Sequence, residues 1–270
     1  MNILSDLDSN IVKSELINFI KKIITESNSN IVVLGLSGGI DSSIVAYILK
    51  EAIPAENIYS YHLYSSTTPK EDTNHARLIA NKFNLNYKEI AIDDILDKYL
   101  DVLDDNISSN ETFKLVVGNL KARIRMSILY YFANLKNGLV AGTGNLSELS
   151  IGYMTKFGDG GCDFELIGDI YKSQLKNLAK SWNIPSEIIN KPPRAGLWDK
   201  QTDEQEIGMT YEALDQIICC LTEDKELKNE DILNKIDIPL SEVNRIRDKI
   251  KNNKHKIHIP PIPAINKKSL

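Results

Sequence analysis

A short segment rich in glycine and serine carries the clearest chemical signal of the chain. It reads IVVLGLSGGIDSS over residues 31–43, an aliphatic run followed by two glycines, three serines and a carboxylate. Gly38 and Gly39 let backbone N–H groups converge on an anion, and the serine hydroxyls add donors at the positive end of a following helix. Asp41 would repel phosphate in such a loop unless a divalent cation joined them. The segment therefore predicts a binding loop for a magnesium-bound polyphosphate.

This segment differs from the common nucleotide-binding loop, because no Lys-Ser/Thr pair follows its second glycine. A plainer interpretation is a Gly-Gly turn between a strand and a helix, with Ser or Asp as the cap. The pattern SGG-x-DS resembles the pyrophosphate-binding loop of the ATP pyrophosphatase superfamily, whose members cleave ATP to AMP and pyrophosphate. The resemblance implies a set of ATP-binding residues in this loop: Gly35, Leu36, Ser37, Gly38, Gly39, Ile40, Asp41 and Ser42.

Length and composition favour one domain over residues 1–270, because 42% of the 270 residues are hydrophobic. The net charge of −5 provides no general basic field for nucleic acid or an anionic membrane. The N-terminus has no signal-peptide pattern, and no apolar run approaches the ~20 residues of a membrane span, so we expect a cytoplasmic protein. Cys162, Cys219 and Cys220 lack zinc spacing and are interpreted as thiols without metal or redox chemistry.

Strand and helix patterns alternate along the first half of the chain. We expect strands in the aliphatic run from residue 31 and at residues 57–64, 87–92 and 138–143. We expect helices at residues 10–26, 43–51, 69–84, 93–105, 111–137 and 170–182, with a further helix starting at 145. This rhythm predicts an α/β fold, a Rossmann-like parallel sheet with helices on both faces and a helical C-terminal part. Ligands then gather at the carboxyl ends of the strands.

Two segments rich in glycine or proline interrupt this pattern, at residues 152–169 and 191–204. Irregular loops of that length within a compact domain are usually lids or binding segments. We expect both loops to be mobile without ligands and ordered when substrates are bound.

Further motifs in the same order sharpen the resemblance. SGGIDS, KARIRM, GTGNLSE, GYMTKFGDGGCD, IGDIYKSQ, KPPRAGLWDKQTDE and HK before PP extend over residues 31 to 261. In this order they resemble the ammonia-dependent NAD⁺ synthetases. The resemblance implies a homodimer of Rossmann-like subunits, with the dinucleotide at the interface, that amidates deamido-NAD⁺ with ATP and ammonia through an adenylated intermediate.

The resemblance also implies roles for individual residues. Asp41 and Glu148 match the Mg²⁺ ligands, and Asp159 is our choice for the ammonia site. The implied ATP contacts outside the phosphate loop are Thr143, Lys172 and Arg194. The implied deamido-NAD⁺ contacts are Arg123, Lys156, Asp163, His255 and Lys256.

Each of these residues also has a plainer interpretation. Glu148 is consistent with an exposed carboxylate at a helix start, and Lys172 with a solvated helix lysine. Arg123 is consistent with a helix-surface arginine and His255 with a solvated tail residue. Arg194 departs from the family, which commonly has Ser or Thr there, so a short hydroxyl contact would become a long guanidinium.

Two other functions compete with this interpretation. A tRNA-thiolating or GMP-forming synthetase belongs to the same superfamily, but thiolation requires a catalytic cysteine pair and a basic RNA surface. A regulatory module would instead bind ATP without turning it over. Only about thirty residues precede the first expected strand, far fewer than a glutaminase domain of roughly 100 residues, so we expect free ammonia, or ammonia from a separate protein, as the nitrogen source. Residues 111–137 contain more apolar side chains than one helix face packed against a single sheet would use, which favours the expected homodimer.

Overall fold

The computed structural model describes residues 4–103, 111–194, 196–198, 201–222, 232 and 235–263. Its centre is a five-stranded sheet in the order β3-β2-β1-β4-β5, in which all paired strands run parallel. The strands are β1 (Val32–Gly35), β2 (Ile58–Tyr64), β3 (Asn86–Ala91), β4 (Leu139–Gly142) and β5 (Phe164–Glu165). The strand order reverses between β1 and β4, and such a switch point is where open parallel sheets bind ligands.

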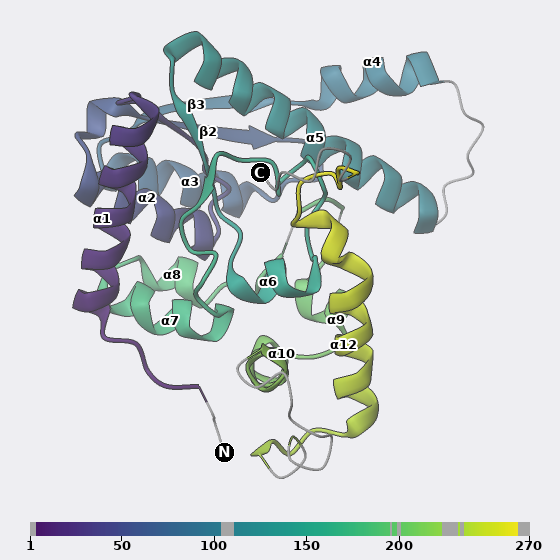
Figure 1. Ribbon diagram of the computed structural model, residues 1–270. Helices are drawn as coiled ribbons and strands as arrows, with labels where there is room; N and C mark the ends of the chain where they lie inside the picture. Colours follow the sequence, from purple (N-terminus) through teal and green to yellow (C-terminus); the bar gives the residue numbers. More distant parts are fainter. Residues whose placement is uncertain are drawn as a thin grey trace.

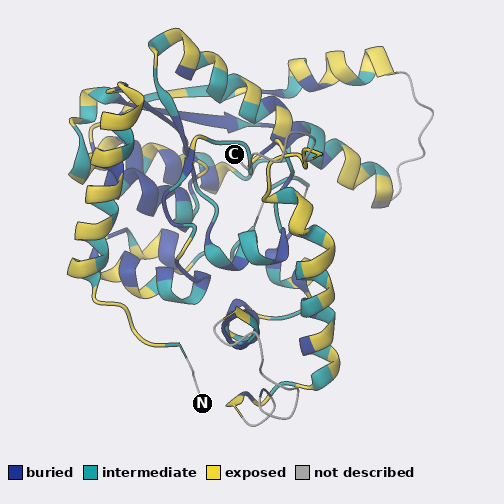
Figure 2. Cartoon of the chain, in the orientation of Figure 1, coloured by how far each residue is buried: buried dark blue, intermediate teal, exposed yellow. Residues whose placement is uncertain are grey.

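The aliphatic run of β1 occupies the middle of the sheet because both of its faces are covered. Val32 and Leu34 belong to one hydrophobic core, whereas Val33 belongs to the core on the opposite face. This alternation follows the two-residue period of a strand. Figure 2 shows the buried strands enclosed by helices whose outer sides are exposed. The fold is therefore the expected Rossmann-like α/β architecture.

Helices cover the two faces unequally. Residues of five helices share a core with β1 on the first face, and α4 and α5 pack on the second. Figure 1 shows α1, α2 and α3 on the side of the sheet away from α5. The first set is α1 (Ser9–Ser27), α2 (Ile40–Ala52), α3 (Lys70–Lys82), α7 (Lys172–Ser181) and α8 (Ser186–Ile189); the second is α4 (Asp93–Leu103) and α5 (Glu111–Lys136). A 3₁₀ turn, η1 (Ala55–Asn57), precedes β2.

The C-terminal part is helical and has a core of its own, which includes Ile151, Tyr211, Leu214 and Val243. Its elements are α6 (Leu146–Ile151), α9 (Asp203–Ile207), α10 (Tyr211–Thr222), α12 (Leu240–Asn253) and η2 (Lys254–Lys256). This core lies beside the carboxyl ends of β1 and β4, because α6 follows β4 directly. No helix in the described part of the chain is long and apolar enough to cross a membrane.

The predicted elements are confirmed except at two places. Helix α2 begins at Ile40, three residues earlier than expected, which places Asp41 in its first turn. The segment 152–169 is not irregular throughout, because Phe164 and Glu165 form β5 and pair with β4 through Ala141↔Phe164. A two-residue strand beside several glycines has no local pattern, and the buried position of Phe164 against β4 stabilises it. Residues 104–105 of the expected helix 93–105, and residues 195, 199 and 200 of the expected loop 191–204, lie outside the described residues.

Candidate active site

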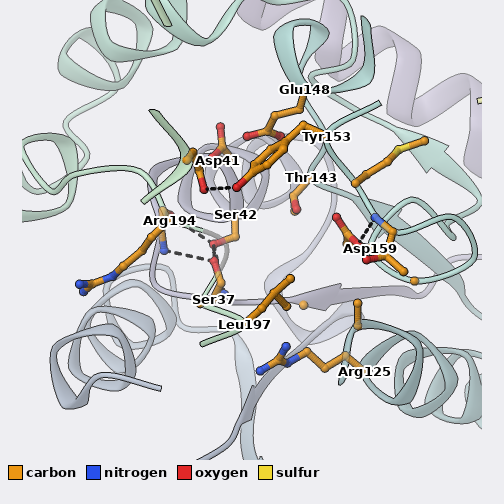
Figure 3. A pocket seen from close by; sticks show the side chains of 18 of the residues that line it. Ser37, Asp41, Ser42, Arg125, Thr143, Glu148, Tyr153, Asp159, Arg194 and Leu197 are labelled. Carbon is orange, nitrogen blue, oxygen red and sulfur yellow. Dashed lines mark hydrogen bonds between the residues drawn. The ribbon is translucent and has the colours of Figure 1, made fainter. Parts of the chain in front are cut away.

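A cavity of about 510 Å³ opens at the carboxyl ends of β1 and β4, at the switch point of the sheet. The phosphate loop, the turn after β4, the first turn of α7 and parts of both irregular loops line it (Figure 3). The sequence-predicted residues among its lining are Gly35, Leu36, Ser37, Gly39, Ile40, Asp41, Ser42, Thr143, Glu148, Asp159, Lys172, Arg194 and Lys256. The fold therefore brings most of the expected site together.

The phosphate loop joins β1 to α2 in a conformation that requires glycine at one position. Gly38 has φ +80°, and a Cβ there would lie 2.1 Å from the backbone oxygen of Asp72. The hydroxyl oxygens of Ser37 and Ser42 lie 3.0 Å apart, and the N–H of Gly39 donates to Ser37 Oγ at 3.2 Å. Hydroxyl and amide groups thus gather at the positive end of α2, as an anion site requires.

Asp41 and Glu148 come from different helices and meet around one cation. The ammonium of Lys172 donates to Asp41 Oδ2 and, at 3.3 Å, to Glu148 Oε1. Asn145 caps α6 by accepting from the N–H of Glu148 at 3.0 Å, and its side-chain amide donates to Asp41 at 3.3 Å. The cap of α6 therefore fixes one carboxylate relative to the other.

Burial dominates the electrostatics of this cluster. It raises the pKa of Glu148 to about 7, against the opposing attraction of Lys172. Burial also opposes the charge of Lys172, but the carboxylates of Asp41, Glu148 and Asp203 together raise the pKa of this ammonium. The site holds a fixed positive charge and an excess of carboxylates around it.

Two tyrosines and a third carboxylate extend the cluster beyond what the sequence predicted. The hydroxyl of Tyr211 lies 3.3 Å from carboxylate oxygens of both Glu148 and Asp203, and the hydroxyl of Tyr153 lies 3.1 Å from Asp203 and 2.6 Å from Glu206. Asp203 is buried, and burial raises its pKa. It lies in the motif QTDE, which the sequence resemblance included without assigning a role to its acids. Two further residues of the cavity were given no role from the sequence. Lys191 begins the motif KPPRAGLWDKQTDE, and Asp72 lies in the first turn of α3, outside the motifs.

Arg194 points away from the serine hydroxyls of the phosphate loop (Figure 3). Its guanidinium donates to Glu71 at 2.9 Å and to Asp72 at 2.7 Å, both in the first turn of α3. The long side chain therefore reaches past the position that a short hydroxyl would occupy, although it lines the cavity.

Asp159 lies in a tight turn at the other side of the cavity and accepts from the N–H of Thr155 at 2.8 Å. Thr155 in turn donates its hydroxyl to Asn119 of α5 at 2.7 Å. Asp159 is accessible from the cavity, yet the protein surrounding it raises its pKa by desolvation. A carboxylate of raised pKa is the stronger base, which suits it to accept a proton.

Four of the five residues expected at deamido-NAD⁺ form a connected group, and one of them, Lys256, lines the cavity. Arg123 donates to the carbonyl of Lys156 at 3.3 Å, and Lys156 donates to the carbonyl of His255 at 2.7 Å. Lys256 reaches into the cavity wall and donates to the carbonyl of Gly152 at 2.7 Å. The first loop and the C-terminal segment are joined through these cations.

Asp163 is the exception to this grouping. Its carboxylate accepts from the hydroxyl of Tyr130 at 3.1 Å and from the N–H of Val140 at 2.7 Å. It is not among the residues that line the cavity. In this chain Asp163 links α5 to the edge of β4, and its contact with a substrate stays a prediction.

The donor set around Lys172 fits a magnesium ion that is shared with a nucleotide. Asp41 and Glu148 already enclose one cation, the ammonium of Lys172. Among the described residues no group of three or more His, Cys, Asp or Glu side chains is arranged to hold a metal by itself. Mg²⁺ commonly takes one or two carboxylates and completes its shell with water and phosphate oxygens.

Known proteins resemble this chain over most of its length. The model of the NAD synthase family matches residues 12–260. The NH₃-dependent NAD⁺ synthetase of Methanocaldococcus jannaschii is 43% identical to this chain, and the alignment covers 94% of this chain and 96% of that one. The enzyme of the same name from Fusobacterium nucleatum is 37% identical over 97% of this chain and 98% of its own length.

Two solved structures have the same architecture. The NH₃-dependent NAD synthetase of Campylobacter jejuni superposes with a TM-score of 0.78 at 32% identity, covering 95% of this chain and all of that one. The NMN synthetase of Francisella tularensis superposes with a TM-score of 0.82 at 29% identity, covering 96% of this chain and 99% of that one. The two differ in the nucleotide that their names indicate.

Proposed function

The chain belongs to the NAD synthase family, and from this membership we infer that it makes NAD⁺ by amidating deamido-NAD⁺ with ammonia in an ATP-dependent reaction. The product of the first step is an adenylated dinucleotide, and AMP and pyrophosphate are released. The protein is thus a ligase that forms a C–N bond at the end of NAD⁺ biosynthesis.

One observation supports the assignment of the reaction to this cavity. Asp41 and Glu148, 107 positions apart in the sequence, enclose the ammonium of Lys172 directly beside the phosphate loop. Cation, carboxylates and convergent backbone donors are the groups that phosphoryl chemistry requires, because its transition state is stabilised by charge rather than by covalent chemistry.

The first step forms the leaving group that a free carboxylate lacks. A carboxylate oxygen of deamido-NAD⁺ attacks the α-phosphorus of ATP, and the bond to the β,γ-pyrophosphate breaks. The donors of residues 37–42 and the ammonium of Lys172 stabilise the charge that develops on the departing pyrophosphate. We assign Asp41 and Glu148 as ligands of Mg²⁺, which when bound neutralises part of the same charge. Thr143 lies at the same end of the cavity and is assigned to ATP.

The second step is attack of ammonia on the acyl-adenylate, which expels AMP. Ammonium has no free lone pair, so a base must first remove a proton. We assign this role to Asp159, because it lines the cavity and desolvation by the surrounding protein raises the pKa of its carboxyl group, which makes it a stronger base. The rim cluster of Arg123, Lys156, His255 and Lys256 is assigned to the dinucleotide, whose phosphates match the charges of Arg123, Lys156 and Lys256.

We also propose that two copies of the chain associate through α4 and α5. An apolar groove lies between these helices, lined by Ile90, Ile95, Tyr99, Ile124, Ser127, Ile128, Tyr131 and Phe132. Tyr131 and Leu135 are each more than 60% exposed in the single chain, and α4 stands away from the body of the molecule (Figure 2). A second copy would cover this face. The dinucleotide site at the interface and the cytoplasmic location stay predictions.

The likeness to the Francisella tularensis protein supports a second candidate substrate. That protein is named an NMN synthetase, so its nucleotide is the mononucleotide counterpart of NAD⁺. The chemistry at the nicotinate carboxylate is the same for a mononucleotide and a dinucleotide. Only the dinucleotide carries an adenylyl moiety, and this moiety would occupy the rim cluster.

The test is an end-point assay that resolves the nucleotide products. The purified protein is incubated with ATP, Mg²⁺, ammonium chloride and either deamido-NAD⁺ or nicotinate mononucleotide. We expect NAD⁺ and AMP in equal amounts with the dinucleotide and much slower turnover of the mononucleotide. The opposite preference would favour the second candidate, and ATP binding without AMP formation would favour the regulatory module.

A further inference from the structure

We propose that Lys191, at the start of the second irregular loop (residues 191–204), helps to bind the polyphosphate of the nucleotide. It does so by orienting the peptide between Gly38 and Gly39 and by placing a positive charge against the phosphate loop. This inference rests on the proposed function, because it concerns the same nucleotide. Asp72 acts as the positioning residue for Lys191. Lys191 begins the motif KPPRAGLWDKQTDE, in which the sequence resemblance assigned a role only to Arg194, and Asp72 lies outside the motifs.

Lys191 lies directly after α8 and is held on two sides. Its ammonium donates to the carbonyl of Gly38 at 2.8 Å and to Asp72 Oδ1 at 2.9 Å. The side chain of Lys191 is only 7% exposed, yet the residue lines the cavity. An ammonium has three N–H donors, so one remains for an oxygen that enters the cavity.

The contact with Gly38 determines where a loop donor points. The peptide between Gly38 and Gly39 is trans and planar, so its N–H points opposite to its carbonyl. Lys191 holds the carbonyl, and the N–H of Gly39 consequently points to Ser37 Oγ, 3.2 Å away on the cavity side. Without the ammonium this peptide is free to rotate, and Gly38, which has φ +80°, offers little resistance to rotation.

Asp72 is well placed to hold the lysine. It lies in the first turn of α3, where the positive end of a helix favours a carboxylate. Its backbone oxygen packs against Gly38 so closely that no Cβ fits between them. The phosphate loop, the start of α3 and Lys191 therefore form one unit, and the lysine cannot be displaced without moving the loop.

Arg194 is the cation that the sequence resemblance assigned to ATP, but its surroundings differ from those of Lys191. Its guanidinium is shared between two carboxylates, Glu71 and Asp72, and extends away from the serine hydroxyls of the phosphate loop. Arg194 is paired with two carboxylates, whereas Lys191 is paired with Asp72 alone and also donates to the backbone of the phosphate loop. Of the two cations, Lys191 is therefore the one in direct contact with the phosphate loop.

The test measures pyrophosphate binding without requiring turnover. Calorimetry with magnesium pyrophosphate, and separately with magnesium ATP, is carried out on the full chain and on Lys191→Met, which keeps most of the aliphatic stem and removes the charge. We expect both ligands to bind at least about tenfold more weakly, because hydrogen bonds to charged groups are among the stronger ones. Lys191→Arg should restore part of the affinity, and Arg194→Ser should cause a smaller loss than Lys191→Met.

Two controls separate a binding role from a structural one. Lys70→Met removes a charge from an exposed residue beside the same helix start and should bind pyrophosphate as the wild type does. The KM for deamido-NAD⁺ should be unaffected by Lys191→Met, whereas collapse of the loop would raise it together with that for ATP. Lys191→Gln is the substitute if the methionine variant does not fold, and it should also bind weakly.

The proposal is overturned if Lys191→Met, or its glutamine substitute, binds magnesium pyrophosphate within threefold of the wild type. It is also overturned if Arg194→Ser causes the larger loss. Failure of the proposed function has a different signature, since the wild type would then bind pyrophosphate normally and form no NAD⁺.

Discussion

Lys172 donates a hydrogen bond to Asp41 across the junction of α7 and α2, and the same ammonium reaches Glu148 at 3.3 Å. The lysine is nearly inaccessible, with 5% of its side chain exposed. A buried ammonium between two carboxylates occupies the place that a divalent cation would take beside the phosphate loop. In this structure the ammonium of Lys172 donates to the two carboxylates. Once Mg²⁺ is bound to those carboxylates, the ammonium would donate to a phosphate instead.

The first prediction concerns the two carboxylates. Asp41→Asn retains the shape of the side chain and removes a charge, so kcat should fall by about 100-fold or more while the far-UV circular dichroism is unchanged. Glu148→Gln should behave in the same way. In the double variant the losses should be less than additive, because both residues are assigned to one ion. Strict additivity would indicate separate roles.

The second prediction follows from the cation that these carboxylates share. Lys172→Met leaves Asp41 and Glu148 facing each other without a counter-charge, so the variant should be less stable than the wild type. Added Mg²⁺ should raise its melting temperature more than it raises that of the wild type, because a ligand that binds only the folded state stabilises it. The variant Asp41→Asn/Lys172→Met is the control, and an equal Mg²⁺ response in it would argue against the site.

Much of the fold was predictable from the sequence, whereas the details of the site were not. The aliphatic run before Gly38 predicted β1 because its period and its buried composition are local properties. Strand β5 was missed because Phe164 and Glu165 are stabilised by contacts distant in sequence, the pairing with β4 and the packing of Phe164 against Phe19. Asp72 was missed for a similar reason, since an acid after Pro69 reads as a favourable helix start and nothing local indicates its contact with Lys191.

Site residues that lie far apart in the sequence could be assigned to one site only through the family resemblance. Asp41 and Glu148 meet only because the parallel sheet places the ends of β1 and β4 side by side. No periodicity predicts that meeting. The plain interpretation of Glu148 as an exposed carboxylate at a helix start is right about the helix start, where Glu148 completes the cap of α6, and wrong about exposure, because only 17% of its side chain is exposed. Arg194 shows the limit of the resemblance, because its longer side chain reaches Glu71 instead of remaining at the phosphate loop.

The third prediction concerns Glu165 of β5, which fills the space beside Gly142 and accepts from the N–H of Gly144 at 2.9 Å. Burial raises its pKa to about 7 from the usual 4.5. The folded state thus holds the proton more tightly than the unfolded state, and the stability this provides is present below pH 4.5 and is lost as the pH rises through about 7. Glu165→Gln should therefore gain stability relative to the wild type over that window, on the order of 3 kcal/mol in total.

Urea unfolding of both proteins at pH 5 and pH 8 measures this difference. The same substitution at the exposed Glu56 is the matched control for loss of a carboxylate. Parallel stability curves for the wild type and Glu165→Gln would contradict the prediction.

The fourth prediction concerns the association of two chains. Light scattering at micromolar concentration should give a mass near twice the 30.4 kDa of the chain. Tyr131→Glu places a charge in the apolar groove on α5, where burying it against a second copy would be costly, and should shift the mass toward the single chain. Ser9→Glu on α1 controls for added charge. A single-chain mass for the wild type would refute the dimer.

The last prediction concerns the two loops at the mouth of the cavity. An acyl-adenylate is readily hydrolysed, so the site must exclude water between the two steps and still admit ammonia. The first loop is tied to the C-terminal segment through Lys156 and His255, and the second is tied to the start of α3 through Lys191 and Arg194. These cations are the groups that substrate phosphates attract, so bound substrates should replace contacts within the protein and close both loops. Trypsin should therefore cleave after Lys156 and Arg194 in the free protein, and deamido-NAD⁺ together with a non-hydrolysable ATP analogue should suppress both cleavages more than either ligand alone. Equal cleavage with and without the two ligands would show that the loops do not close over the site, even if the enzyme makes NAD⁺.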